Sequence, residues 1–135
     1  MAVFLNNGVQ VTVNSVALTD HVTSVTLNRT FDELEVTAMG DSGHKFVKGL
    51  EASSLTIDFL NDTATGEVLQ TLQAAYGTSV TVTAKQTSAV VSATNPLYTM
   101  TCLVNNLTDI NGAVGDLGTQ SVTWNVNGTV AVTTA

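Results

Sequence analysis

The chain has 135 residues and a mass of 14.0 kDa, the size of one domain, so we expect a single domain over residues 1–135. Four Lys and Arg residues stand against 11 Asp and Glu residues, and the net charge of −7 excludes a basic nucleic-acid-binding surface. Apolar residues make up 44% of the chain, which excludes wholesale disorder. No apolar run approaches the ~18 residues of a membrane helix, and residues 1–7 do not resemble a secretion signal, so we expect no membrane insertion.

The content of charged residues is low, at 11% against roughly 25% in a typical soluble protein. Thr supplies 23 residues and Val supplies 20, and both are β-branched residues that favour extended backbone. Monomeric proteins usually guard their exposed strand edges with Lys or Pro, but this chain has three Lys residues and one Pro. The composition therefore suits the subunit of an assembly as well as it suits a polar β-protein.

Apolar and polar residues alternate in six stretches along the chain, within residues 9–13, 25–27, 55–59, 80–82, 100–104 and 122–126. A period of two places one face of a strand in the core and the other face in solvent. Several short strands at this spacing predict a mainly β chain that forms an antiparallel β-sandwich or partial barrel.

One segment, residues 63–76, has helical rather than strand spacing of its apolar residues. Asp62 or Thr63 is placed to cap the start of the helix, and Gly77 is placed to end it in a left-handed turn. We expect one amphipathic α-helix that flanks the sheets and turns its apolar stripe to the core.

Charges gather in residues 29–62, which hold seven of the acidic residues, whereas no charged residue follows Asp116. The glycine-rich stretches 39–45 and 111–118 predict two loops. The uncharged C-terminal part predicts a strand that is buried in a sheet or lies against a neighbouring subunit.

The string Gly40-Asp41-Ser42-Gly43 resembles the nucleophile loop of chymotrypsin-like serine proteases. That chemistry needs a histidine base within hydrogen-bond reach of the serine. The one upstream histidine, His21, lacks the surrounding sequence of those enzymes, and His44 replaces the glycine that usually follows the string. We therefore expect a glycine-rich turn, and a chain that is not an enzyme.

Neither histidine sits at a spacing that supplies metal ligands, and Cys102 has no second thiolate to join it, so we expect no metal and no cofactor. Cys102 lies in the apolar phase of its stretch, which predicts a buried and unreactive thiol. Trp124 shares the phase of its apolar neighbours and is expected in the core or at a subunit contact.

The stretch 36–59 carries a more specific pattern than any of these strings. It holds a Thr-x-x-Gly-Asp turn at residues 37–41, a short segment that leads back to Gly49-Leu50, and an alternating strand over residues 54–59. This pattern, with the chain length, the acidic balance and the helix in mid-chain, resembles the major tail (tail tube) proteins of long-tailed bacteriophages.

The resemblance implies a virion protein made in the bacterial host cytoplasm, with a tail-tube-like β-sandwich fold. Six copies would form a ring whose central strands make a continuous barrel, and stacked rings would form the tube through which DNA passes during ejection into the host cell. Its partners would be further copies and the tape-measure, tail tip and terminator proteins. Terminal arms would bridge subunits, and a loop, residues 38–50 here, would reach the adjacent ring. The contact residues of that loop would be Asp41, His44, Lys45, Phe46 and Lys48.

A DNA conduit that repels phosphate would carry carboxylates and hydroxyls on its wall. The candidate lumen-facing acids are Asp32, Glu33, Glu35 and Asp58. The alternative for Asp32, Glu33 and Glu35 is that they are ordinary solvated acids. The alternative interpretation is a β-sandwich binding module, such as a capsid decoration protein or an adhesion or carbohydrate-binding domain.

Overall fold

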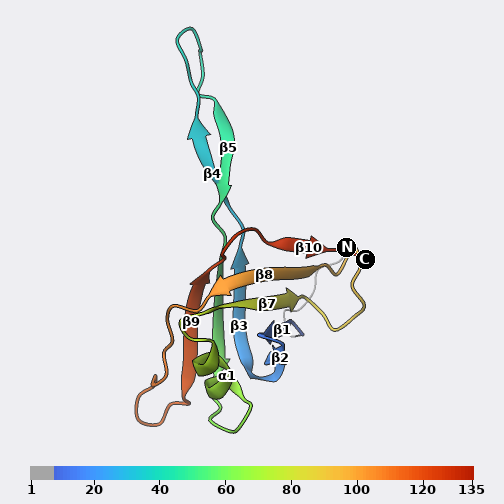
Figure 1. Ribbon diagram of the computed structural model, residues 1–135, viewed down its shortest axis with the longest axis vertical. Coiled ribbons are helices and arrows are strands. Elements are labelled where there is room, and N and C mark those ends of the chain that lie inside the picture. The colour runs from blue at the N-terminus through green and yellow to red at the C-terminus, as the bar shows by residue number, and fades with distance from the viewer. Residues whose placement is uncertain (1–7) are drawn as a thin grey trace.

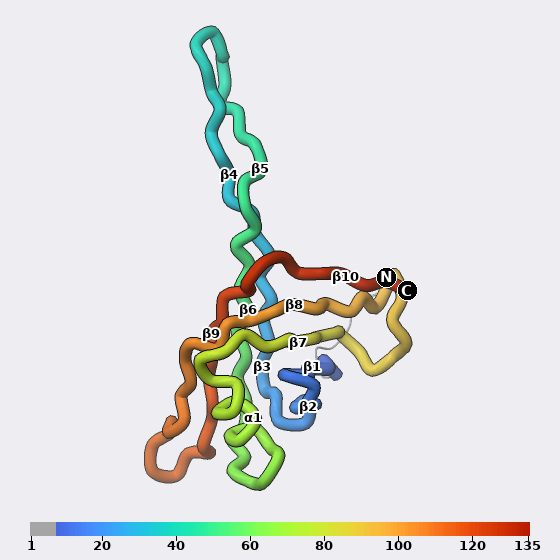
Figure 2. Tube along the Cα trace, in the orientation of Figure 1, coloured from blue at the N-terminus to red at the C-terminus, as the bar shows by residue number. Residues whose placement is uncertain are grey.

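The computed structural model describes residues 8–135, so the expectations for residues 1–7 lie outside it. Two antiparallel sheets pack against each other, one helix covers one end of the body, and a long two-stranded hairpin projects from the opposite end (Figure 1). The Cα trace in Figure 2 shows how far the tip of this hairpin lies from the body. The expected fold class, mainly β with antiparallel sheets and one flanking helix, is confirmed, and the described strands form no closed barrel.

The larger sheet has five strands in the order β10-β8-β7-β1-β2. Its strands are β1 (Gln10–Val13), β2 (Val16–Ala17), β7 (Ser79–Lys85), β8 (Leu97–Leu103) and β10 (Ala131–Thr133). The smaller sheet has the order β3-β6-β9 and consists of β3 (Val22–Asn28), β6 (Ser54–Leu60) and β9 (Thr119–Asn125). A short 3-10 helix, η1 (Thr19–His21), joins the two sheets between β2 and β3.

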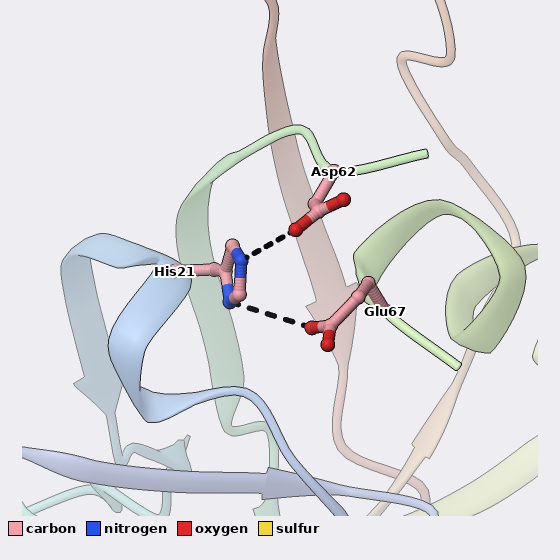
Figure 3. A group of neighbouring side chains, drawn as sticks. All are labelled: His21, Asp62 and Glu67. Atoms are coloured by element: carbon pink, nitrogen blue, oxygen red, sulfur yellow. Dashed lines mark hydrogen bonds and ion pairs between the residues drawn. The ribbon is translucent and has the colours of Figure 1, made fainter. Parts of the chain in front are cut away.

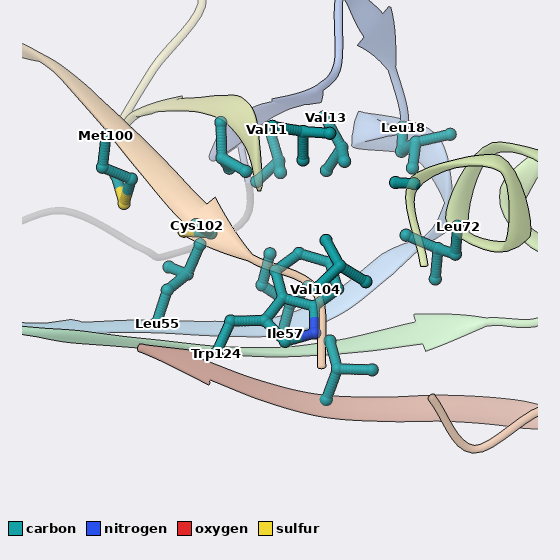
Figure 4. Packing of buried hydrophobic residues seen from close by; sticks show 14 of the residues in the cluster. Val11, Val13, Leu18, Leu55, Ile57, Leu72, Met100, Cys102, Val104 and Trp124 are labelled. Atoms are coloured by element: carbon teal, nitrogen blue, oxygen red, sulfur yellow. The ribbon is translucent and has the colours of Figure 1, made fainter. Parts of the chain in front are cut away.

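The core lies between the two sheets (Figure 4). Most of it comes from inward residues that the alternation predicts, and Leu18, Val130 and the helix residues Val68, Leu72 and Ala75 complete it. On β6, Leu55, Ile57 and Phe59 are fully buried, and the residues between them are not. Trp124 on β9 is fully buried as well, and its indole Nε1 donates a hydrogen bond to the backbone oxygen of Asn106 at 3.2 Å. A buried indole N–H needs such a partner, so this bond fixes the position of the loop that carries Asn106.

The helix α1 (Val68–Ala75) is shorter than the expected span of 63–76. Its N-cap residue is Glu67, which makes no side-chain capping bond, so the prediction that Asp62 or Thr63 caps the helix is wrong. Asp62 instead accepts a hydrogen bond from the backbone N–H of Ala64 at 2.9 Å, which stabilises a separate turn before the helix. The predicted left-handed turn at Gly77 is confirmed by its φ of 82°.

The hairpin consists of β4 (Phe31–Glu35) and β5 (Phe46–Glu51), which pair only with each other among the described strands. The loop that the glycine-rich stretch 39–45 predicted is confirmed, but the longer loop that the resemblance implied, residues 38–50, ends in strand β5. The prediction failed because β5 alternates only weakly: Lys48 and Gly49 interrupt its apolar residues. The remaining residues, 36–45, form the tip, where Gly40 adopts a φ of 90° in the turn.

Candidate assembly surfaces

The projecting hairpin has two faces of different chemistry. The register pairs Glu33 with Lys48 and Glu35 with Phe46, so these side chains share one face. Lys48 also places its ammonium 4.2 Å from the centre of the Phe31 ring. The opposite face carries the pair Leu34 and Val47.

This second face is apolar, and no described part of the chain covers it. Leu34 is 52% exposed, and Val36 and Val47 are each 47% exposed. A two-stranded hairpin alone is marginally stable in water, and exposed apolar patches of this kind mark contact surfaces. The hairpin therefore has the chemistry of an arm that packs against another molecule.

Gly49 keeps the two strands of the arm close together. A Cβ atom at this position would meet the backbone oxygen of Asp32 at 2.9 Å and the Asp32 Cβ at 3.0 Å. These contacts are shorter than carbon atoms tolerate, so only glycine fits without a shift of β4.

The five predicted contact residues all lie on the arm, but they do not all present free side chains. Asp41 accepts hydrogen bonds from the backbone N–H of Ala38 at 2.8 Å and from Lys45 Nζ at 2.9 Å. These bonds, that from Ala38 first, hold the pKa of Asp41 below its ordinary value. Asp41 is thus a structural group of the tip, whereas His44 and Lys45 remain mostly exposed.

A hydrogen bond ties His44 to β4. Its Nδ1 lies 2.7 Å from Glu35 Oε2, and Thr37 Oγ1 donates to the same oxygen at 2.8 Å. The contact with His44 and that with Thr37 lower the pKa of Glu35. Phe46 and Lys48 belong to β5, on the charged face of the arm.

The four candidate lumen acids lie on two different elements. Asp32, Glu33 and Glu35 are exposed on β4 of the arm, and Asp58 lies on β6 in the body. Glu33 and Glu35 share the charged face of the arm, and Asp32 lies between Phe31 and Glu33 where the register shifts. The fold therefore does not collect these four carboxylates into one cluster.

The outer face of the three-stranded sheet is a polar surface that the sequence did not single out. The alternation that buries the core residues turns nine others outward, and the register aligns them in three rows across β3, β6 and β9. The rows are Ser24–Asp58–Ser121, Thr26–Thr56–Thr123 and Asn28–Ser54–Asn125. We call these nine residues the hydroxyl face.

The hydroxyl face carries one carboxylate, Asp58, and neither a cation nor an aromatic ring. Ser121 Oγ donates to Asp58 Oδ1 at 2.6 Å, and the hydroxyls of Thr56 and Thr123 lie 3.1 Å apart. Such a surface is hydrated, and it offers phosphate groups no cation to bind.

His21 forms the one cluster of possible metal ligands in the described residues (Figure 3). Its Nε2 lies 2.9 Å from Asp62 Oδ2, and its Nδ1 lies 2.9 Å from Asp20 Oδ1 and 3.7 Å from Glu67 Oε2. His21, Asp62 and Glu67 offer ligand atoms within 4.8 Å of one another. The spacing along the chain gives no sign of this cluster, because 41 residues separate His21 from Asp62, and the expectation that no metal binds stays a prediction.

The carboxylates around His21 favour its protonated form. Burial lowers the pKa of the ring, but the hydrogen bonds that the ring donates to Asp62 and Asp20 and the charges of Asp20 and Glu67 outweigh burial, so the pKa is raised above its ordinary 6.5. The bond from Ala64 N–H and then the contact with His21 lower the pKa of Asp62. The cluster is an ion-paired bridge that joins η1 to the turn before α1.

Neither Cys102 nor Ser42 forms a hydrogen bond with a histidine in the described residues. Cys102 is fully buried, as predicted, and burial raises the pKa of its thiol to about 11. Ser42 lies at the tip of the arm, whereas His21 lies in the body beside the turn that precedes α1 (Figures 1 and 3). The two cannot form a nucleophile and base pair, and Gly40-Asp41-Ser42-Gly43 belongs to the tip turn, as predicted.

A pocket of about 380 Å³ opens between the two sheets, where Val25 and Leu27 of β3 face Tyr98 of β8. The Arg29 guanidinium already lies over the Tyr98 ring, 6.0 Å from its centre. A sugar-binding site usually offers a free aromatic face, so this pocket gives little support to the binding-module alternative. No helix in the part of the chain described here is long and apolar enough to cross a membrane.

Comparisons with known proteins concern the fold. No family model and no curated protein matches the chain. A chain in the cryo-EM structure of the anti-feeding prophage (AFP) baseplate, 6-fold symmetrised, matches with a TM-score of 0.55. The match covers 99% of this chain and 98% of that chain at 12% sequence identity. The two chains share a fold over their whole lengths, and the arm is part of the aligned region.

Proposed function

We propose that this chain is a structural subunit of a phage-type tail, which assembles head to tail into hexameric rings that stack as a tail tube. The observation that carries the proposal is the pairing of an uncovered apolar arm with a flat hydroxyl face on one small domain. An isolated hairpin of this kind gains stability only when it packs against another molecule. The fold match to a chain from a 6-fold symmetrised prophage baseplate supports a ring-forming subunit.

In this proposal the hydroxyl face lines the channel, and the arm reaches the adjacent subunit or ring. Asp58 supplies the negative charge of the channel wall, whereas Asp32, Glu33 and Glu35 lie on the arm, where Glu33 and Glu35 share a face with Lys48 and Phe46. The lumen then repels the phosphate backbone of DNA, which passes without specific binding. His44, Lys45, Phe46 and Lys48 are the proposed contact residues, and Asp41 holds the tip in shape for that contact.

The assembly has no catalytic part in this proposal. It belongs to the virion, after synthesis in the bacterial host cytoplasm, and its partners are the tape-measure, tail tip and terminator proteins. A head-to-tail interface that closes by rotation produces a ring, and a second interface stacks the rings. The body and the arm provide two separate surfaces for these two contacts.

Negative-stain electron microscopy of the purified protein, first dilute and then concentrated, tests the proposal. We expect hollow rings at intermediate concentration and tubes with a central channel at high concentration. Uniform small globules that persist at every concentration, and persist when tip and tape-measure proteins are added, would contradict the proposal. Measurable glycan binding by such globules would favour the binding-module alternative.

A further inference from the structure

The outer edge of β9 is covered by side chains rather than by another strand. The three-stranded sheet ends at β9, yet Asn106 Nδ2 donates to the backbone oxygen of Thr123 at 2.8 Å. The backbone N–H of Ser121 donates to Thr108 Oγ1 at 2.7 Å, and the same hydroxyl donates to the Ser121 oxygen at 3.1 Å. Next along the edge, the Thr119 N–H donates to the oxygen of Asn111 at 3.3 Å.

The Thr108 hydroxyl does what a residue of a neighbouring strand does in a sheet. In a narrow antiparallel pair, one residue accepts from the N–H and donates to the C=O of the residue opposite. A hydroxyl carries one donor and two acceptor sites, so a single Thr side chain satisfies both groups of Ser121. Residues 106–111, which we call the edge cover, therefore occupy the place of a fourth strand.

Further hydrogen bonds hold the edge cover: Asn61 Nδ2 donates to the Asp109 oxygen at 3.3 Å, Asn111 Nδ2 donates to Thr119 Oγ1 at 2.9 Å, and two more bonds come from below. Trp124 donates to the Asn106 oxygen, and the Thr108 N–H donates to Oε1 of the fully buried Gln120 at 3.1 Å. These two bonds use backbone groups of the cover, so they survive when the side chains of Asn106 and Thr108 are truncated. The side chain of Ile110 within the cover and that of Val114 beyond it are both fully exposed.

The other edge of the same sheet matches the covered one. β3 and β9 each have seven residues, and both run antiparallel to β6, so they run parallel to each other. Their outward side chains are Ser, Thr and Asn in both strands. In a ring formed by rotation, β3 of one copy approaches β9 of the next copy in this parallel direction, and the three rows of the hydroxyl face continue across the contact.

We propose that the edge cover is an autoinhibitory contact, and that β3 of a second copy displaces it when subunits assemble. This inference rests on the proposed ring-forming function. A strand ladder along seven residues supplies more backbone hydrogen bonds than the few bonds of the cover, so the exchange favours assembly once subunits meet. In a dilute subunit the cover hides the edge, which protects a chain that has few Lys and Pro residues to guard it.

The test compares the double variant Asn106→Ala/Thr108→Val with wild type. The matched control is Asn127→Ala/Thr129→Val, which removes the same two side chains at the same spacing from an exposed turn where neither forms a side-chain hydrogen bond in the described structure. Sedimentation velocity over a concentration series measures the assembly threshold, and circular dichroism confirms that each variant is folded. We expect the cover variant to assemble at a roughly tenfold lower concentration than wild type and control.

Amide hydrogen exchange on the dilute subunit gives a second readout. The Ser121 amide should exchange faster in the cover variant than in wild type, because its acceptor is gone. An unchanged or higher assembly threshold overturns the inference, and so does an unchanged Ser121 exchange rate. If wild type forms rings while the threshold of the variant is unchanged, only the edge cover fails and the proposed function stands. If wild type and variant are both folded and both remain monomers, the inference about the edge cover is overturned. The proposed function is then tested separately by the addition of tip and tape-measure proteins.

Discussion

His21 connects two parts of the body through carboxylates on both sides of its ring. Asp62 lies at Nε2, and Asp20 and Glu67 lie at Nδ1, while the His21 side chain is only 17% exposed. A protonated ring donates to both sides at once, whereas a neutral ring has one N–H and loses one of these bonds. The protonation of one side chain thus sets the strength of the bridge between η1 and the segment before α1.

This bridge predicts a pH dependence of stability. The pKa of His21 is raised in the folded state, so the protonated ring contributes its full stabilisation below about pH 6.5 and loses it as the pH rises through the folded pKa. We expect the free energy of unfolding to fall between about pH 6 and pH 8, and His21→Asn to flatten that slope. Urea unfolding at a series of pH values measures it. The control His44→Asn removes an exposed histidine from the arm and should keep the wild-type slope; equal slopes in wild type and His21→Asn would contradict the prediction.

At the scale of single residues, the sequence predicted the burial of side chains that follow the local alternation of apolar and polar residues. Cys102 and Trp124 lie in the apolar phase of their strands and are buried, because a period of two places every second residue in the core. The His21 cluster could not be predicted, because its members come from η1 and from the chain before α1, far apart in sequence. The edge cover could not be predicted either. The sequence does not show that Asn106 and Thr108 lie beside β9, and their hydrogen bonds depend on that position.

At the scale of elements, the arm depends on one close approach between its strands. Gly49 leaves room for the backbone of Asp32, and Leu34 Cγ would lie 3.3 Å from an added Cβ. The sequence predicted a contact loop here but not its second strand, because exposed strands lack a buried face to impose alternation. The start of the helix was predicted too early in the chain. Asp62 has the side chain of a helix cap, but it accepts its hydrogen bond from Ala64 in a separate turn that precedes the helix.

The substitution Gly49→Ala should therefore disrupt the arm without unfolding the body. The added Cβ forces β4 and β5 apart, and we expect a cost of about 1–3 kcal/mol to the local stability of the hairpin. Amide exchange at β4 and β5 should accelerate, and ring or tube formation should fail, while the thermal unfolding of the body stays near that of wild type. The control is Gly43→Ala in the tip, where a Cβ meets no atom within 4 Å. Normal assembly by Gly49→Ala would show that the arm is not a contact element.

At the scale of the whole molecule, the two sheets cover opposite sides of the core and present different outer surfaces. The five-stranded sheet and α1 cover the core from one side, and the three-stranded sheet covers it from the other and turns the hydroxyl face outward. Alternation in the sequence predicted the strands of the three-stranded sheet and three strands of the other sheet, but not β2 or β10, and it could not order the strands or show that nine polar residues align in rows. The order β3-β6-β9 also leaves β3 and β9 at the edges of the sheet, where the proposed ring would extend the face from copy to copy.

The charge of the hydroxyl face leads to the last prediction. If this face lines a channel, Asp58→Lys replaces the one carboxylate of the nine residues by a cation in every subunit, and the wall of the assembled tube becomes attractive to phosphate. We expect tubes of Asp58→Lys to retain short duplex DNA that is protected from nuclease and that salt releases. Wild-type tubes should retain no DNA.

The control Asp116→Lys makes the same charge change on the exposed loop before β9, so nuclease should digest DNA that is bound to that variant. Asp58→Asn removes the charge but keeps an oxygen that can accept from Ser121, so it shows whether loss of the negative charge alone disturbs assembly. Nuclease-sensitive DNA on Asp58→Lys tubes would place the hydroxyl face on the outside and assign the channel to another surface.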